Sequence, residues 1–120
     1  SWGWNSYGQL GDGTTTTRLA PVPVLTGAQG VAAGFAHTVA QKIDGTRWAW
    51  GLNTDGQLGD GGTVSRAAPV AVLSGVQTIA AGTLHALAIK SDRSLWAWGD
   101  NQFGQIGDGT AVGRPAPVQQ

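Results

Sequence analysis

The stretch WGLNTDGQLGDG, residues 50–61, occurs three times in this chain in closely related forms. The other two copies are WGWNSYGQLGDG (residues 2–13) and WGDNQFGQIGDG (residues 98–109). The copies begin 48 residues apart (50 − 2 and 98 − 50), and 25 of the 48 positions are identical between residues 25–72 and 73–120. The chain is therefore built from copies of a single repeat. Residues 1–24 are the second half of one copy, and residues 25–72 and 73–120 are two complete copies.

Side chains within one copy alternate with the period of a β-strand. His85, Leu87 and Ile89 share one face of a strand, and Trp96 and Trp98 share one face of another. Several short strands copied every 48 residues are typical of the blades of a β-propeller. The sequence predicts an all-β fold, a partial β-propeller of about 2.5 four-stranded blades. We expect the tryptophan face of each blade to pack on the alanine-bearing face of its neighbour.

Composition excludes several classes of function. Seven basic residues balance seven acidic ones, and the basic residues are scattered, so no stripe could follow a nucleic acid or anchor the chain to a membrane surface. The longest apolar run is too short to span a bilayer. Without cysteine there is no disulfide, thiol nucleophile or thiolate metal site. We therefore expect neither nucleic acid nor membrane as a partner.

Three polar residue types recur at fixed positions and could carry chemistry. Each Gly-Asp-Gly turn offers one carboxylate, which favours a structural role over calcium binding. The recurring arginines are expected to pair with these carboxylates or to brace the next blade. The recurring histidines could bridge a metal, but hydrogen bonding to buried backbone groups is the favoured interpretation. These sets are Asp12, Asp60 and Asp108; Arg18, Arg66 and Arg114; and His37 and His85.

No Ser/His/Asp arrangement and no close pair of carboxylates is visible, so the sequence predicts no catalytic, metal-binding or cofactor-binding residue. Positions that differ between the copies are better candidates for a specific site, because folding does not fix them. Large aromatic side chains at such loop positions are typical anchors of protein interfaces. The candidate protein-binding residues are Trp4, Tyr7, Phe35, Asp55, Leu84 and Phe103.

The motif WxWGxNxxGQLGxG, a proline-marked stretch and then IAAGxxHxLAI resemble the repeat of the regulator-of-chromosome-condensation family, in its bacterial type. Here they are residues 48–61 and 79–89. The resemblance covers the whole chain. It implies a propeller, commonly of seven four-stranded blades, whose rim loops bind proteins.

The sequence thus predicts a non-enzymatic module that binds a protein partner through its variable loops. Because propellers have about four to eight blades, 2.5 repeats leave apolar faces and strand edges open. The chain is expected to be part of a larger propeller or to self-associate. The alternative is a purely structural spacer in a bacterial surface or secreted protein. An extracellular or cell-surface location is expected in preference to a cytoplasmic one.

Overall fold

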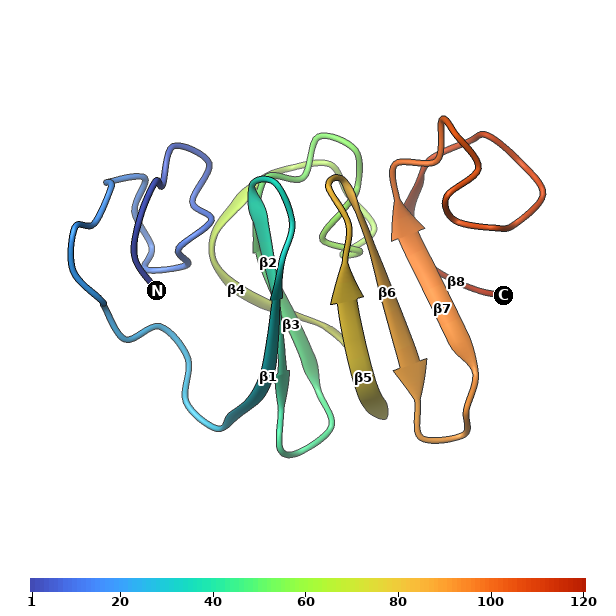
Figure 1. Cartoon of the computed structure of the whole chain (residues 1–120), viewed down its shortest axis with the longest axis horizontal. Helices are drawn as coiled ribbons and strands as arrows, with labels where there is room; N and C mark the ends of the chain where they lie inside the picture. The colour runs from blue at the N-terminus through green and yellow to red at the C-terminus, as the bar shows by residue number, and fades with distance from the viewer.

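Two four-stranded antiparallel sheets stand side by side in the molecule (Figure 1). The computed structural model describes residues 1–120, and the sheets span residues 28–73 and 76–119. In both sheets the strand order follows the chain, so every connection joins neighbouring strands. No helix in the structure could cross a membrane. The strands are β1 (Ala28–Ala33), β2 (His37–Lys42), β3 (Arg47–Gly51), β4 (Arg66–Leu73), β5 (Val76–Ala81), β6 (His85–Lys90), β7 (Leu95–Gly99) and β8 (Arg114–Gln119).

The register of β2 and β3 explains how the alternation of large and small side chains in the sequence gives the sheet two different faces. Thr38 lies opposite Trp50, and Val39 lies opposite Ala49. Successive side chains in a strand point to opposite faces. The indole therefore lies on one face of the sheet, and the small apolar pair lies on the other. The prediction of an all-β, partial propeller is confirmed by this architecture.

Residues 1–27 form no regular strand, but they keep one pairing that both sheets contain. Gly3 and Arg18 form an antiparallel bridge, in which the two N–H···O distances are 2.7 and 3.0 Å. The complete sheets pair Gly51 with Arg66 and Gly99 with Arg114 in the same way. The first segment thus has the backbone pairing of the second half of a repeat.

The core lies between the two sheets, where β5 packs against β1 and β2. Trp98 is fully buried there, in one apolar cluster with Val39 and Ala49. The guanidinium of Arg47 lies 4.2 Å from the indole centroid, and the Trp98 Nε1–H donates to the carbonyl of Gln57 (3.1 Å). The expectation that small apolar residues cover the indoles is therefore incomplete, because an arginine and a main-chain turn also cover Trp98.

The same contacts join each repeat to the next. Trp50 Nε1 donates to the Gln9 carbonyl (2.9 Å), and one repeat later Trp98 Nε1 donates in the same way to the Gln57 carbonyl. The Gly13 N–H donates to the Ala67 carbonyl, and the Gly61 N–H donates to the Pro115 carbonyl, both at 2.9 Å. Residues 1–24 therefore dock on the first sheet as the first sheet docks on the second.

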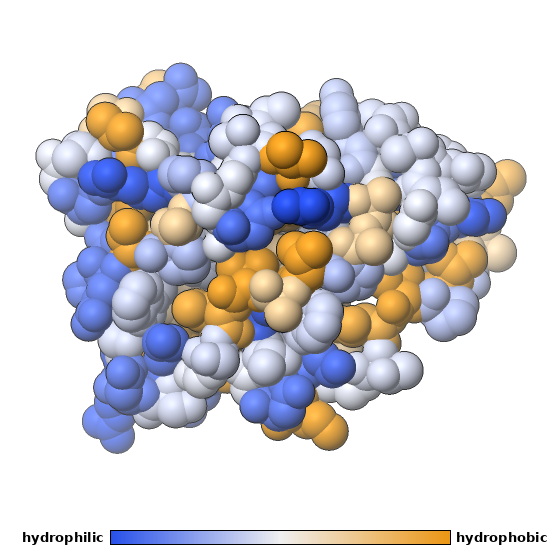
Figure 2. Space-filling view, turned by 180° about the vertical axis from the view of Figure 1, so that it is seen from behind, coloured by the Kyte–Doolittle hydropathy of each residue, from blue (hydrophilic) through white to orange (hydrophobic).

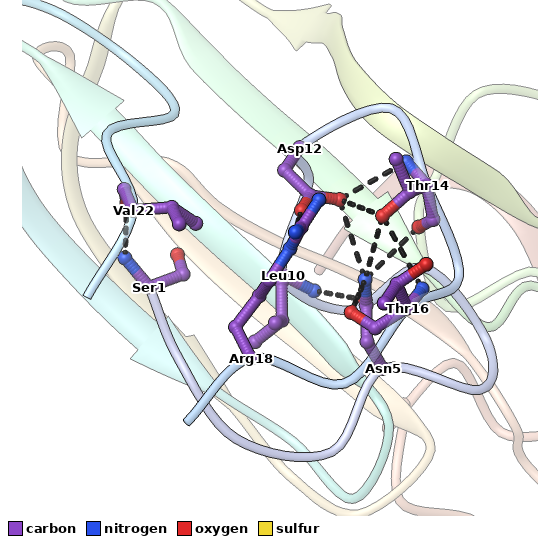
Figure 3. Close-up of polar contacts among 8 residues, drawn as sticks. All are labelled: Ser1, Asn5, Leu10, Asp12, Thr14, Thr16, Arg18 and Val22. Carbon is purple, nitrogen blue, oxygen red and sulfur yellow. Dashed lines mark hydrogen bonds and ion pairs between the residues drawn. The ribbon is translucent and has the colours of Figure 1, made fainter. Parts of the chain in front are cut away.

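A buried asparagine holds each Gly-rich loop in shape (Figure 3). The Asn5 side chain is fully buried, and its Nδ2 donates to the carbonyls of Thr14 and Thr16, both at 3.0 Å. Its Oδ1 accepts the Leu10 N–H at 2.9 Å. Asn53 and Asn101 make equivalent bonds. One side chain thus satisfies the backbone groups of a loop that has no regular secondary structure.

The recurring aspartates and arginines pair within the same loops, as the sequence predicted. The Nε–Oδ2 distances are 2.8, 3.3 and 2.6 Å in the first, second and third copies. Hydrogen bonds from the Thr14 side chain and from Arg18 hold the pKa of Asp12 well below its usual range, and Thr110 and Arg114 do the same for Asp108. These carboxylates are committed to the loops, which supports their structural interpretation.

Replacing Asn53 with Ala tests the role of the buried asparagines. The change leaves the buried Leu58 N–H without its acceptor and removes three bonds from Nδ2. We expect the free energy of unfolding to fall by about 2–4 kcal/mol, measured by urea denaturation, because unsatisfied buried groups are costly. Thr54→Ala, an exposed neighbour, is the control and should change stability by less than about 0.5 kcal/mol. Equal effects of the two changes would contradict this role.

Candidate functional site

The loops in which the repeats differ lie together along one edge of the molecule (the top edge in Figure 1). The tight turns between β1 and β2 and between β5 and β6 reach this edge, as do the long loops that follow β3 and β7. The Gly-rich loop of residues 1–18 lies along the same edge. The short β2–β3 and β6–β7 connections lie at the opposite edge. One edge therefore carries the positions at which a specific site could arise.

Three of the candidate residues gather at this edge. The Trp4 and Tyr7 ring centroids are 5.4 Å apart at an interplanar angle of 81°, and those of Trp4 and Phe35 are 6.3 Å apart at 70°. Both are edge-to-face arrangements, which aromatic pairs prefer. The three side chains, which we call the aromatic cluster, remain 49%, 42% and 63% exposed.

Backbone hydrogen bonds fix the two loops that carry the aromatic cluster. The Tyr7 N–H donates to Gln9 Oε1 (2.9 Å), and the turn that contains Tyr7 is closed by the Gly8 N–H, which donates to the Asn5 carbonyl (3.0 Å). The Phe35 N–H donates to the Thr83 carbonyl of the second sheet (3.1 Å). The rings are thus presented by loops whose backbones are already held, although no strand includes them.

A depression of about 370 Å³ lies beside the aromatic cluster, lined by residues of segments 1–10 and 33–38. His37 lines it and is 1% exposed, yet neither ring nitrogen has a hydrogen-bond partner. The expected hydrogen bonds from this histidine to buried backbone groups are therefore not formed within hydrogen-bond distance, and its ring packs against Gly34. Desolvation, with the charges of Arg47 and His85, lowers the pKa of His37 to about 4. The imidazole is consequently neutral at pH 7.

The other candidate residues do not join the aromatic cluster. Leu84 and Phe103 line a second depression of about 310 Å³ at the same edge, between the β5–β6 turn and the loop after β7. Phe103 is 85% exposed. Asp55 is exposed in the loop after β3 and lines neither depression. The structure therefore separates the six candidates into two groups and one isolated carboxylate.

Sequence reasoning missed the glutamines that shape this edge. Gln9 lines the larger depression, and Gln105 lines the smaller one, where its Nε2 donates to Asp100 (2.8 Å). Gln57 is fully buried between the sheets. Their recurrence at one position in all three copies was the available signal. No group of three His, Cys, Asp or Glu side chains lies close enough to hold a metal ion.

Models of known families match most of the chain. The model described as the regulator of chromosome condensation (RCC1) repeat matches residues 1–41 and 44–89, and a second model of the same description matches residues 76–105. The chain belongs to the RCC1 repeat family. A search of curated proteins finds no match.

Solved structures share the fold of these RCC1 repeats. Prp20p from Saccharomyces cerevisiae superposes with a TM-score of 0.81 at 21% identity, over 98% of this chain and 33% of that chain. Yeast RCC1 (Prp20) bound to Kap60 superposes with a TM-score of 0.81 at 21% identity, over 98% of this chain and 32% of that chain. Human WBSCR16 superposes with a TM-score of 0.74 at 26% identity, over 97% of this chain and 33% of that chain. The chain thus spans about a third of the length of each of these solved chains. The assignment to the bacterial type of the repeat stays a prediction.

The neutral, buried His37 predicts a loss of stability in acid. Its pKa is about 4 in the folded chain against an ordinary value of 6.5, so the unfolded chain binds more protons between these values. Stability should therefore fall as the pH drops from 6.5 to 4, by about 3 kcal/mol. Urea denaturation at each pH measures this change. The His37→Gln variant should lose most of the dependence in this window; an unchanged profile would show that His37 is not its source.

Proposed function

We propose that this RCC1 repeat chain is a non-enzymatic protein-binding module and that the aromatic cluster is the centre of its binding surface. One observation carries the proposal. Trp4, Tyr7 and Phe35 come from two different repeats, pack edge to face, and keep about half of their surface exposed. By contrast, the indoles of Trp50 and Trp98, which serve the core between repeats, are covered.

The physical chemistry of interfaces supports this choice. Trp and Tyr dominate interface hot spots because they bury a large area and have few rotatable bonds. In the cluster the rings are already packed on each other, so little side-chain entropy is lost when a partner covers them. The adjacent depression, which includes Gln9 and the neutral His37, could accept an uncharged side chain of that partner.

Structures of proteins with this fold also support the proposal. One describes the binding properties of Prp20p to Gsp1p and histones, and another shows yeast RCC1 bound to Kap60. Both describe the same relative, Prp20 of yeast, which therefore binds proteins. The sequence identity between those chains and this one is 21%. We therefore carry over to this chain only the class of partner, a protein, and not any particular partner.

A structural spacer is the competing hypothesis, and mutating the cluster distinguishes the two. The double variant Tyr7→Ala/Phe35→Ala removes two of the three rings. Leu19→Ala/Val64→Ala removes side chains that are 96% and 65% exposed outside the cluster and serves as the control. All three chains are immobilised, and the proteins captured from the native host are quantified by mass spectrometry.

We expect capture of specific partners to fall at least tenfold with the cluster variant and to be unchanged with the control, since two hot-spot side chains contribute about 1 kcal/mol or more each. The melting temperatures should stay within a few degrees, because the rings are half exposed. Equal capture by all three chains would favour the spacer.

A further inference from the structure

The tight turn between β1 and β2 carries one ring of the aromatic cluster and, two residues later, a buried histidine. The Gly34 N–H closes this turn by donating to the His37 carbonyl (2.9 Å). Phe35 lies between these two residues, and its ring packs on Trp4 with the centroids 6.3 Å apart. A movement of the turn therefore also moves Phe35 within the aromatic cluster.

One backbone hydrogen bond holds the same turn against the second sheet. The Phe35 N–H donates to the carbonyl of Thr83, in the turn between β5 and β6 (3.1 Å). Apolar residues also reach the surface on the far side of the molecule (Figure 2), but the backbone of Phe35 is bonded across the joint between the two sheets. We call the packing of residues 34–37 against residues 82–85 the turn contact.

The ring of His37 lies inside the turn contact. A Cβ at Gly34 would overlap this ring and would also lie 2.5 Å from the Gly82 carbonyl oxygen, so ring, turn and second sheet are closely packed. The histidine is 1% exposed, and no acceptor lies within hydrogen-bond distance of either ring nitrogen. The imidazole is thus enclosed between the two turns.

A proton on the enclosed ring would have no compensation. The imidazolium form has two N–H donors, and both would be buried without acceptors, which costs free energy. The charged or titratable groups that face His37 are Arg47 of β3 and His85 of β6, and both disfavour a further positive charge. Residues 1–10 contribute no charged side chain to the depression beside the ring. The proton is therefore accepted more readily once the turn has left the second sheet and water reaches the ring.

We propose that protonation of His37 opens the turn contact and withdraws Phe35 from the aromatic cluster, so that the partner-binding surface is intact near neutral pH and disrupted in acid. This inference rests on the proposed function, because it assigns a regulation to the same surface. Histidine is the side chain that commonly provides such a switch. The element with two states is the turn contact, which the Phe35–Thr83 bond and the neutral ring hold closed.

The pKa of His37 in the two states gives the direction and the size of the effect. Desolvation, with the charges of Arg47 and His85, lowers this pKa to about 4 in the closed state, and in the open state we expect the ordinary value of 6.5. The open state therefore binds more protons between these values, and falling pH favours opening. Between pH 7 and pH 4 the ratio of open to closed turns should rise on the order of 100-fold.

The histidine one repeat later supplies a matched control. His85 follows Gly82 as His37 follows Gly34, and its ring packs on that glycine in the same way. His85 is only half-buried, so a proton on its ring does not require a turn to move. His37→Gln should abolish the response of Phe35 to pH, because glutamine takes up no proton in this range. His85→Gln should leave the response in place.

The two phenylalanines of the chain allow the turn to be followed without a partner. They are Phe35 and Phe103, so labelling with para-fluorophenylalanine gives two fluorine NMR resonances, which a Phe103→Leu variant assigns. We expect the Phe35 resonance to move toward its position in the unfolded chain between pH 7 and pH 4. The far-UV circular dichroism should remain that of the folded chain, because the sheets stay paired. The protection of the Phe35 amide against hydrogen exchange should fall at least tenfold.

A Phe35 response that is present in the wild-type chain and in His85→Gln, and absent in His37→Gln, would support the proposal. His37→Asn is a second neutral variant in case His37→Gln does not fold. A response of equal size in the His37 variants would overturn the proposal, as would an unmoved Phe35 resonance in the folded wild-type chain at pH 4. Loss of the sheet signal together with the Phe35 response would also overturn it, because the whole chain would then be unfolding.

Capture of proteins from the native host separates this proposal from the one on which it rests. We expect capture by the wild-type chain to fall at least threefold between pH 7 and pH 4.5, and capture by His37→Gln to persist. Equal wild-type capture at both pH values would overturn the regulation. If no specific partner is captured at pH 7, the proposed function fails, and the fluorine resonance of Phe35 alone decides whether the turn contact opens.

Discussion

The contact on which the rest of the structure depends is that between a tryptophan of one repeat and the glycine-rich turn of the repeat before it. Trp98 lies against Gly59, and Trp50 lies against Gly11 so closely that a Cβ at either glycine would be 2.6 Å from the indole Nε1. Each indole N–H also bonds a carbonyl of that turn. Because this bond is directional, the contact sets both the spacing and the register of successive repeats.

Stability and specificity are assigned to different residues of each repeat. Buried Asn5, Asn53 and Asn101 hold the loops from inside, so the exposed loop positions are free to vary. At one place this freedom has produced an aromatic cluster, and at another a depression beside Phe103. The positions that the copies share therefore provide the rigid scaffold, and under our proposal the positions that differ provide the surface that a partner recognises.

Repetition made the fold predictable, because every copy reports the same alternation and the same turns. The Asp–Arg pairs were predictable for the same reason. Arg47 was not, since the next copy has Leu95 at that position and comparison of copies treats such a residue as variation. The contact between Trp4 and Phe35 could not be predicted from the sequence either, because it depends on how one repeat is rotated relative to the next. The missing partners of the His37 nitrogens depend on the same packing.

Pairs of glycines in one turn test the central contact most directly. Gly59 and Gly61 both have a positive φ, +77° and +86°, so alanine is strained at either, but a Cβ at Gly61 meets no atom within 4 Å. The free energy of unfolding should fall by about 2 kcal/mol more for Gly59→Ala than for Gly61→Ala. Gly107→Ala and Gly109→Ala, in the turn that no indole covers, should have equal effects. Equal costs for Gly59→Ala and Gly61→Ala would contradict the stacking of the repeats through these tryptophans.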